Sequence, residues 1–142
     1  MAELLKSITA YSPEETEKAG AEFSSLLKTK DFVALKGDLG AGKTTFVRGI
    51  ASVLCPGARV QSPTYTVVNE YRGNVPLFHF DMYRITDEDS LYGIGFYDYL
   101  QRDGISVCEW SEKIEEYLPE NIYVVEIDRT EDNSGRTIKI YR

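Results

Sequence analysis

Eight consecutive residues, Gly37 to Thr44, have the types and spacing needed to hold a chain of phosphate groups. They fit the pattern G-x-x-x-x-G-K-[ST] without a substitution. Glycines permit a tight turn in which successive backbone N–H groups point at phosphate oxygens. Lys43 adds a positive charge for the outer phosphates, and the Thr44 hydroxyl is a ligand suited to Mg²⁺. The pattern predicts a site for ATP or GTP with Mg²⁺.

Two apolar segments further along the chain each end in a carboxylate. Asp81 follows the segment 77–80, and Glu109 follows the segment 105–108. Mg²⁺ takes oxygen ligands and keeps several waters, so acids near it bind the ion directly or through water. Two such acids in a chain with a phosphate-binding loop therefore predict a metal site. For Asp81 the alternative is that it caps a turn and pairs with Arg84.

The segment Ser62-Pro63-Thr64 lies between the helix expected after the loop and the next predicted strand. In proteins with this loop, the corresponding segment often senses the γ-phosphate or holds Mg²⁺. The alternative is that it only begins a strand. Trp110, directly after Glu109, is predicted to pack in the core, but its position also allows a role in the site.

Hydrophobic periodicity predicts the elements that position these residues. Residues 32–35 form a short apolar run typical of a buried strand, and apolar spacing over 46–54 predicts a helix after the loop. Strand, loop and helix in this order are the context that the motif requires; otherwise the glycines would mark a chance turn. An earlier helix is expected to begin after Ser12, which can form a capping box with Glu15. Leu26 is expected on the buried face of this helix.

Antiparallel pairs are expected on either side of this unit. Residues 66–71 and 75–83 flank one turn signal, and residues 121–128 and 136–141 flank another. Short helices are expected near residues 86–89 and 112–118, the second of them capped by Ser111. Because there is no repeat or low-complexity linker, the 142 residues predict a single α/β domain.

Composition narrows the range of functions. A net charge of −7 and a pI of about 4.8 argue against broad binding to nucleic-acid phosphates, which requires a basic face. No apolar run approaches the ~20 residues of a membrane span, and we expect a cytoplasmic location. Cys55 and Cys108 are far apart and predict buried thiols rather than zinc ligands. His79, the only histidine, has no Cys or His neighbour that would make it a metal ligand.

Four motifs in this order carry a resemblance to a known family: residues 37–46, 62–65, 79–84 and 109–110. Together they resemble the TsaE (YjeE) family, small bacterial ATPases needed to make threonylcarbamoyladenosine in tRNA. The resemblance covers nearly the whole chain. It implies a three-layer, P-loop NTPase-like fold with a mostly parallel central sheet and antiparallel hairpin additions. It also implies slow Mg²⁺-dependent ATP hydrolysis, activated by a TsaD-type transferase and a TsaB-type paralogue that make most of the contact with tRNA.

The resemblance implies roles for single residues. Lys43 and Asp81 would be catalytic, Asp81 acting on the attacking water or on a metal-bound water, and Thr44 and Glu109 would hold Mg²⁺. The residues expected to bind the nucleotide are Glu14, Gly37, Asp38, Gly40, Ala41, Gly42, Lys43, Thr44, Thr45, Thr64, Gly135 and Arg136. For Glu14 the alternative is a solvated first helical turn, and for Gly135 and Arg136 it is an ordinary turn.

Two other functions stay open. A small-molecule kinase would share the phosphate loop, but such enzymes usually have an arginine-rich lid over ATP, and no segment of that composition occurs. A nucleotide-gated binding module would use its ATP state to control docking, with hydrolysis incidental. The sequence also lacks an N-K-x-D guanine motif, which agrees with ATP rather than GTP.

Overall fold

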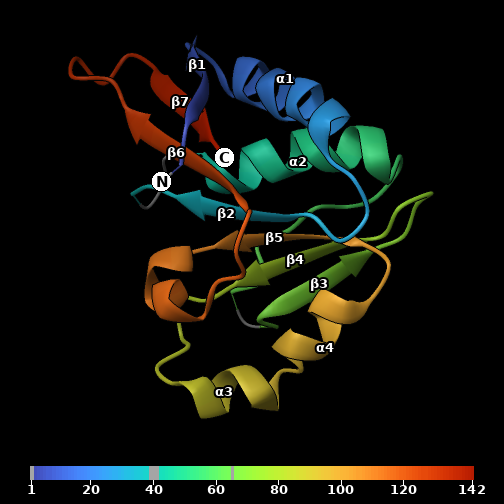
Figure 1. The fold of residues 1–142 in the computed structure, drawn as a ribbon. Coiled ribbons are helices and arrows are strands. Elements are labelled where there is room, and N and C mark those ends of the chain that lie inside the picture. The colour runs from blue at the N-terminus through green and yellow to red at the C-terminus, as the bar shows by residue number, and fades with distance from the viewer. Residues whose placement is uncertain (1, 39–41, 65) are drawn as a thin grey trace.

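The computed structural model describes residues 2–38, 42–64 and 66–142. Within these residues, seven strands form one sheet in the order β1-β7-β6-β2-β5-β4-β3 (Figure 1). The strands are β1 (Leu4–Ala10), β2 (Phe32–Lys36), β3 (Val68–Tyr71), β4 (Leu77–Asp81), β5 (Ile105–Glu109), β6 (Tyr123–Arg129) and β7 (Arg136–Tyr141).

The centre of the sheet is parallel and its edges are antiparallel. Strands β6, β2, β5 and β4 run parallel to one another, whereas β1 and β7 extend the sheet antiparallel beyond β6, and β3 does so beyond β4. Every residue of β4 and β5 is buried, as expected for parallel strands covered on both faces. The predicted sheet, with its antiparallel hairpin additions, is confirmed.

Helices cover both faces and complete three layers (Figure 1). Helices α1 (Pro13–Phe23) and α2 (Lys43–Leu54) lie on one face, with the 3₁₀ turn η1 (Ser24–Leu26) after α1. Helices α3 (Glu88–Gly93) and α4 (Phe96–Gln101) and the 3₁₀ segment η2 (Ser111–Tyr117) lie on the other. No helix among the described residues is both long and apolar enough to cross a membrane.

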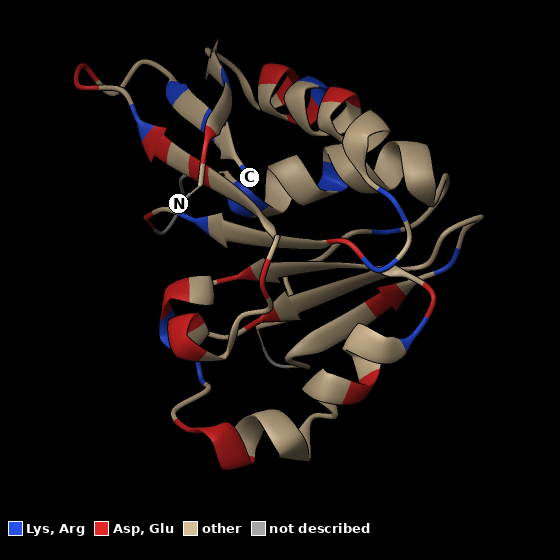
Figure 2. Ribbon diagram, viewed as in Figure 1, with Lys and Arg blue, Asp and Glu red and all other residues tan. Residues whose placement is uncertain are grey.

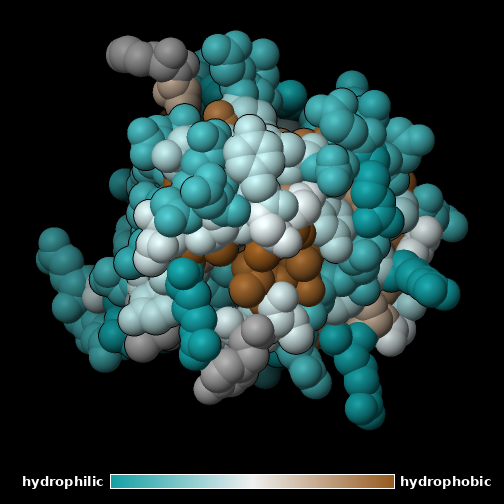
Figure 3. Space-filling view, turned by 90° about the horizontal axis from the view of Figure 1, so that it is seen from below, coloured by the Kyte–Doolittle hydropathy of each residue, from teal (hydrophilic) through white to brown (hydrophobic). Residues whose placement is uncertain are grey.

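Strand alternation divides the core into two clusters. In β2, Val33 and Leu35 pack in the cluster under α1 and α2, whereas Phe32 and Ala34 pack in the cluster under α3, α4 and η2. Figure 3, which views the molecule from below, shows hydrophobic surface near the centre of the view, surrounded by mostly hydrophilic side chains. The same alternation turns the odd-numbered residues of β4 and β5, which include Asp81 and Glu109, toward α2.

The helix ends follow the sequence signals in α1 but not in η2. Ser12 Oγ accepts a hydrogen bond from Glu15 N, and Glu15 Oε1 accepts one from Tyr11 N, both at 3.1 Å. The helix predicted over 112–118 is instead a 3₁₀ segment, and Ser111 does not cap it. Ser111 is buried, and its hydroxyl donates to the Leu35 carbonyl at 3.1 Å, which ties the start of η2 to β2.

One predicted core residue is also exposed. Leu26 has a relative accessibility of 47%, although its spacing matches the buried face of α1. The α-helix ends at Phe23, and the chain tightens into the 3₁₀ turn η1. The tighter turn changes the rotation per residue and carries Leu26 away from the core face.

Candidate functional site

The predicted phosphate-binding loop begins where β2 ends and finishes at the first turn of α2. Gly37 has a φ of 142°, and Gly42, the residue before α2, has a φ of 109°. Residues other than glycine rarely adopt such φ values. A Cβ atom at Gly37 would also lie 2.0 Å from the Ile127 carbonyl oxygen on β6. The chain can leave the sheet in this direction only because residue 37 has no side chain.

Lys43 is buried at the start of α2, and its ammonium group is held by two contacts. Nζ donates to the Gly37 carbonyl oxygen at 2.7 Å and lies 3.8 Å from the centroid of the Trp110 ring. Trp110 has a φ of 57° immediately after β5, and its ring also packs on Tyr83. The turn after β5 therefore brings an aromatic face against the lysine of the loop, a favourable arrangement for a cation.

Asp81 and Glu109 lie side by side at the carboxyl ends of two parallel strands. They are register partners in the β4–β5 pair, and both side chains are almost completely buried. Thr44, in the first turn of α2, directs its hydroxyl at Glu109, with Oγ1 3.1 Å from Oε1 and 3.0 Å from Oε2. The two strand-end acids that the sequence singled out are therefore neighbours in space, and one of them contacts the loop motif.

Three polar groups lie within hydrogen-bond distance of the Asp81 carboxylate. Thr64 Oγ1 donates to Asp81 Oδ2 at 3.1 Å, Ser62 Oγ lies 3.4 Å from the same oxygen, and the Tyr83 backbone N–H donates to Oδ1 at 2.9 Å. The Ser62 and Thr64 hydroxyls also bond each other at 2.9 Å. The Ser-Pro-Thr segment is thus linked to Asp81 rather than forming a strand.

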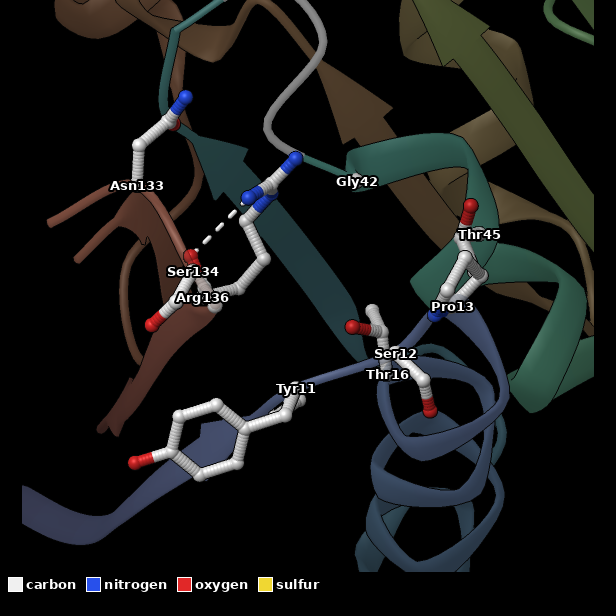
Figure 4. A pocket seen from close by; sticks show the side chains of 11 residues that line it. Tyr11, Ser12, Pro13, Thr16, Gly42, Thr45, Asn133, Ser134 and Arg136 are labelled. Atoms are coloured by element: carbon white, nitrogen blue, oxygen red, sulfur yellow. Dashed lines mark hydrogen bonds between the residues drawn. The ribbon is translucent and has the colours of Figure 1, made fainter.

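Two cavities meet at the start of α2. One, of about 360 Å³, is lined by Gly42, Lys43, Thr44, Thr45, Ser62, Thr64, Asp81, Glu109 and Trp110. The other, of about 330 Å³, lies between the start of α1 and the β6–β7 turn (Figure 4). It is lined by Ala10, Tyr11, Ser12, Pro13, Thr16, Gly42, Thr45, Asn133, Ser134, Gly135 and Arg136. Gly42 and Thr45 line both cavities, so the two adjoin at the start of α2.

The structure brings together most, but not all, of the predicted nucleotide-binding residues. Gly135 and Arg136 line the second cavity, where Arg136 Nη1 donates to the Gly135 carbonyl at 3.0 Å. Glu14 instead lines a shallow groove with Glu17 and Lys18 on another side of α1. Pro13 and Thr16, three residues apart, share the face that borders the cavity, and Glu14 lies about 100° around the helix from Pro13.

The remaining predicted loop residues are Asp38, Gly40 and Ala41. Asp38 is exposed and lines neither cavity. Gly40 and Ala41 lie outside the described residues.

The donor set suits a small hard cation that is completed by other ligands. Among the described residues, no three His, Cys, Asp or Glu side chains cluster to hold a metal ion by themselves. The site offers the Thr44 hydroxyl and the Glu109 carboxylate, with Asp81 beside them. Mg²⁺ is usually bound by one or two carboxylates together with waters and substrate phosphates, so these residues fit it.

Negative charge is concentrated where β4 and β5 end. Burial and then the charges of Asp81, Glu109 and Glu112 raise the pKa of the Cys108 thiol well above its usual value. Both Cys108 and Cys55 are free and buried, as predicted. Elsewhere, Figure 2 shows acidic residues on α1, α3 and η2, with lysines and arginines dispersed rather than gathered on one face.

Sequence reasoning missed several residues that the fold brings to the site. Tyr11, Asn133 and Ser134 line the second cavity through turns that follow no motif. His79 and Tyr71 were also missed. His79 Nε2 lies 2.5 Å from Glu109 Oε2, and His79 Nδ1 lies 3.2 Å from the Tyr71 hydroxyl. The available signal was the alternation in β4, which puts His79 on the same face as Asp81, two residues away.

Comparison with known proteins agrees with this arrangement. The family model described as "Threonylcarbamoyl adenosine biosynthesis protein TsaE" matches residues 10–138, which include every residue that lines the two cavities. The chain belongs to the TsaE family. The resemblance seen in the sequence motifs is therefore confirmed.

TsaE proteins of distant bacteria match over most of their length. The tRNA threonylcarbamoyladenosine biosynthesis protein TsaE of Aquifex aeolicus is 41% identical, over 99% of this chain and 98% of its own. The protein of the same name from Haemophilus influenzae is 40% identical, over 90% of this chain and 86% of its own. The crystal structure of Bacillus subtilis YdiB has a TM-score of 0.82 and 34% identity, covering 99% of this chain and 86% of that one.

Proposed function

We propose that this protein binds ATP with Mg²⁺, hydrolyses the ATP, and thereby serves threonylcarbamoyladenosine modification of tRNA. The observation that carries the proposal is the pairing of Asp81 with Glu109 at adjacent strand ends, against Lys43 and Thr44 of the phosphate loop. The pathway is taken from the names of the relatives. That role would place the protein in the cytoplasm.

The two cavities divide the nucleotide between them. The triphosphate would lie in the cavity of Lys43, Thr44, Asp81 and Glu109, against the N–H groups of the first turn of α2. The base and sugar would lie in the cavity between α1 and the β6–β7 turn, which has aromatic, hydroxyl and amide side chains. Gly42 and Thr45 would border the junction. Cavities of ~300 Å³ or more are of a size that takes small ligands.

Thr44 and Glu109 would hold the metal. When bound, Mg²⁺ neutralises charge on the phosphate oxygens and so stabilises the transition state of phosphoryl transfer. Thr44 already lies within 3.1 Å of both Glu109 oxygens, so little movement is needed for both side chains to face one ion. Lys43 would exchange the Gly37 carbonyl for a phosphate oxygen, a stronger partner because both groups are charged.

Asp81 would orient the attacking water or a water on the metal. Its carboxylate accepts bonds from Thr64 and from the Tyr83 N–H, and a carboxylate with fixed donors is a well-positioned acceptor for one further water proton. Thr64, bonded to Asp81, would lie near the γ-phosphate. Positioning of this kind, with electrostatic stabilisation, supplies most of the catalysis in phosphoryl transfer.

Partners would complete the activity. We propose that a TsaD-type transferase and a TsaB-type paralogue activate hydrolysis and make most of the contact with tRNA. The net charge of −7 and the dispersed basic residues support a subunit that does not itself hold a polyanion.

The test is ATP turnover measured with the protein alone, then with both partners and tRNA. Slow turnover that rises with the partners supports the proposal. Turnover that the partners do not change, or label passing from ATP to a small acceptor, contradicts it and indicates a stand-alone NTPase or a kinase. If Asp81→Ala abolishes turnover but leaves tRNA modification intact, the protein is a nucleotide-gated binding module in which hydrolysis is incidental.

A further inference from the structure

A row of buried polar side chains crosses three strands beneath α2. Tyr71 on β3, His79 on β4 and Glu109 on β5 follow one another diagonally on the face of the sheet that α2 covers. Their relative accessibilities are 7%, 0% and 4%. The Tyr71 hydroxyl lies 3.2 Å from His79 Nδ1, and His79 Nε2 lies 2.5 Å from Glu109 Oε2.

The two ends of this row lie at different parts of the nucleotide site. At one end, Glu109 faces the Thr44 hydroxyl. At the other, the Tyr71 hydroxyl accepts from the Gln61 N–H at 3.2 Å and lies 3.1 Å from the Gln61 carbonyl oxygen. Gln61 directly precedes Ser62, so Tyr71 holds the backbone of the segment whose hydroxyls contact Asp81.

Glu109 needs a second donor because it is buried. The Thr44 hydroxyl has a single proton and cannot satisfy both carboxylate oxygens. An unpaired buried carboxylate is costly, and the only other side chain shown in contact with Glu109 among the described residues is His79. His79 itself has both ring nitrogens engaged and no solvent access, so it is not placed to touch a substrate.

We propose that His79, backed by Tyr71, is the positioning residue that aims Glu109 at the metal and ties the metal site to the segment 61–64. The inference rests on the proposed function. Hydrogen-bond partners behind a metal-binding carboxylate fix its orientation, and removing them typically costs about 10–100-fold in metal affinity. His79 thus acts through Glu109, and Tyr71 acts through His79.

The main test compares metal affinity with nucleotide affinity in the folded protein. Mn²⁺ binding to the protein–ADP complex is followed by electron paramagnetic resonance, and binding of a fluorescent ADP analogue is measured separately in EDTA. For His79→Leu we expect a loss of about 10–100-fold in Mn²⁺ affinity, with metal-free nucleotide affinity unchanged. For His79→Gln we expect partial rescue, because the amide N–H can still donate to Glu109.

Two tyrosine variants make a matched pair. Tyr71→Phe removes the hydroxyl behind His79 and should lower Mn²⁺ affinity less than His79→Leu does. Tyr123→Phe removes a hydroxyl that donates to the Leu26 carbonyl at 3.4 Å, far from the site, and should leave Mn²⁺ affinity unchanged. If His79→Leu does not fold, this pair decides: equal Mn²⁺ affinities in the two variants overturn the proposal.

The single histidine supplies an independent readout. Because His79 is the only histidine, its imidazole nitrogens give one pair of NMR signals without assignment. Adding Mg²⁺ to the protein–ADP complex should shift them, since Glu109 then shares its charge with the ion. Unmoved signals would overturn the link. Failure of the wild-type protein to bind Mn²⁺ with ADP would instead overturn the proposed function, which separates the two outcomes.

Discussion

The Lys43 ammonium lies over the Trp110 ring, 3.8 Å from its centroid, while donating to the Gly37 carbonyl at 2.7 Å. The residue that would hold the outer phosphates is therefore satisfied by the protein itself. Any ligand that recruits Lys43 must displace these contacts. A phosphate is able to do so because charge-assisted hydrogen bonds are roughly twice as strong as neutral ones.

This contact predicts an optical signal. Trp110 is the only tryptophan, so its emission reports on the site alone. When ATP or ADP binds, Lys43 should move off the ring toward phosphate, and the emission should change in intensity or wavelength. Titrating nucleotide while recording fluorescence checks this. No change at a nucleotide concentration shown by another method to saturate the protein would mean that Lys43 keeps its place over Trp110.

Loss of the Lys43 charge should weaken ATP binding without unfolding the chain. A hydrogen bond to a charged group contributes about 1.5–3 kcal/mol, so Lys43→Ala should lower ATP affinity roughly 10–100-fold and abolish turnover. Lys36→Ala is the matched control. Lys36 ends β2, the strand before the loop, but its Nζ pairs with Glu115 at 2.8 Å, away from the cavities. Calorimetric titration with ATP should separate the two variants, and similar affinities would remove Lys43 from the site.

The Thr44 hydroxyl should affect the metal requirement more than nucleotide binding itself. Thr44→Ala removes the group that faces both Glu109 oxygens, so the Mg²⁺ concentration for half-maximal ATP turnover should rise at least about tenfold. Thr44→Ser keeps the hydroxyl and should stay near wild type. Glu109→Ala should raise the same Mg²⁺ requirement. An unchanged Mg²⁺ titration in Thr44→Ala or Glu109→Ala would remove that residue from the metal site.

A side chain at Gly37 should destabilise the fold as well as the site. Gly37→Ala combines a positive φ, which costs a non-glycine residue about 1–3 kcal/mol, with a Cβ placed 2.0 Å from the Ile127 carbonyl oxygen. Thermal unfolding should show a clear fall in Tm. Gly93→Ala, in α3, meets nothing within 4 Å and should be neutral or stabilising. Equal Tm values for the two variants would mean that the backbone of β6 near Ile127 shifts to accommodate the Cβ atom at little cost in stability.

How much of the site was predictable depended on whether its residues belong to local motifs. Gly42, Lys43 and Thr44 occur within one consecutive pattern, and Asp81 and Glu109 end short apolar runs of the length typical of strands. Parallel strand ends meet at one sheet edge, so their proximity followed from the fold class. The register that makes Asp81 and Glu109 direct neighbours required the structure.

Other placements depend on geometry that no short pattern encodes. Glu14, which the resemblance puts beside the nucleotide, lies on another side of α1 from Pro13 and Thr16, which border the cavity. The contact between His79 and Glu109 crosses strands 30 residues apart in the chain. Ser111 was predicted to cap a helix, but its hydroxyl donates to the Leu35 carbonyl of β2 instead. For Ser111, tertiary packing overrode a local preference.

The β6–β7 turn should lose stability at acid pH through one carboxylate. Asp132 Oδ1 accepts bonds from the hydroxyls of Thr130 and Ser134 and from the Ser134 N–H, and these donors lower the pKa of Asp132 from 3.8 to about 2. A lowered folded-state pKa adds stability that is fully present above pH 3.8 and is lost as the pH falls toward 2. Asp132→Asn removes the charge while keeping an acceptor, so it should be less stable than wild type at pH 6–7. The difference should shrink between about pH 4 and pH 2 in urea unfolding series. A stability difference that does not change over this range would mean that the charge of Asp132 does not stabilise the turn.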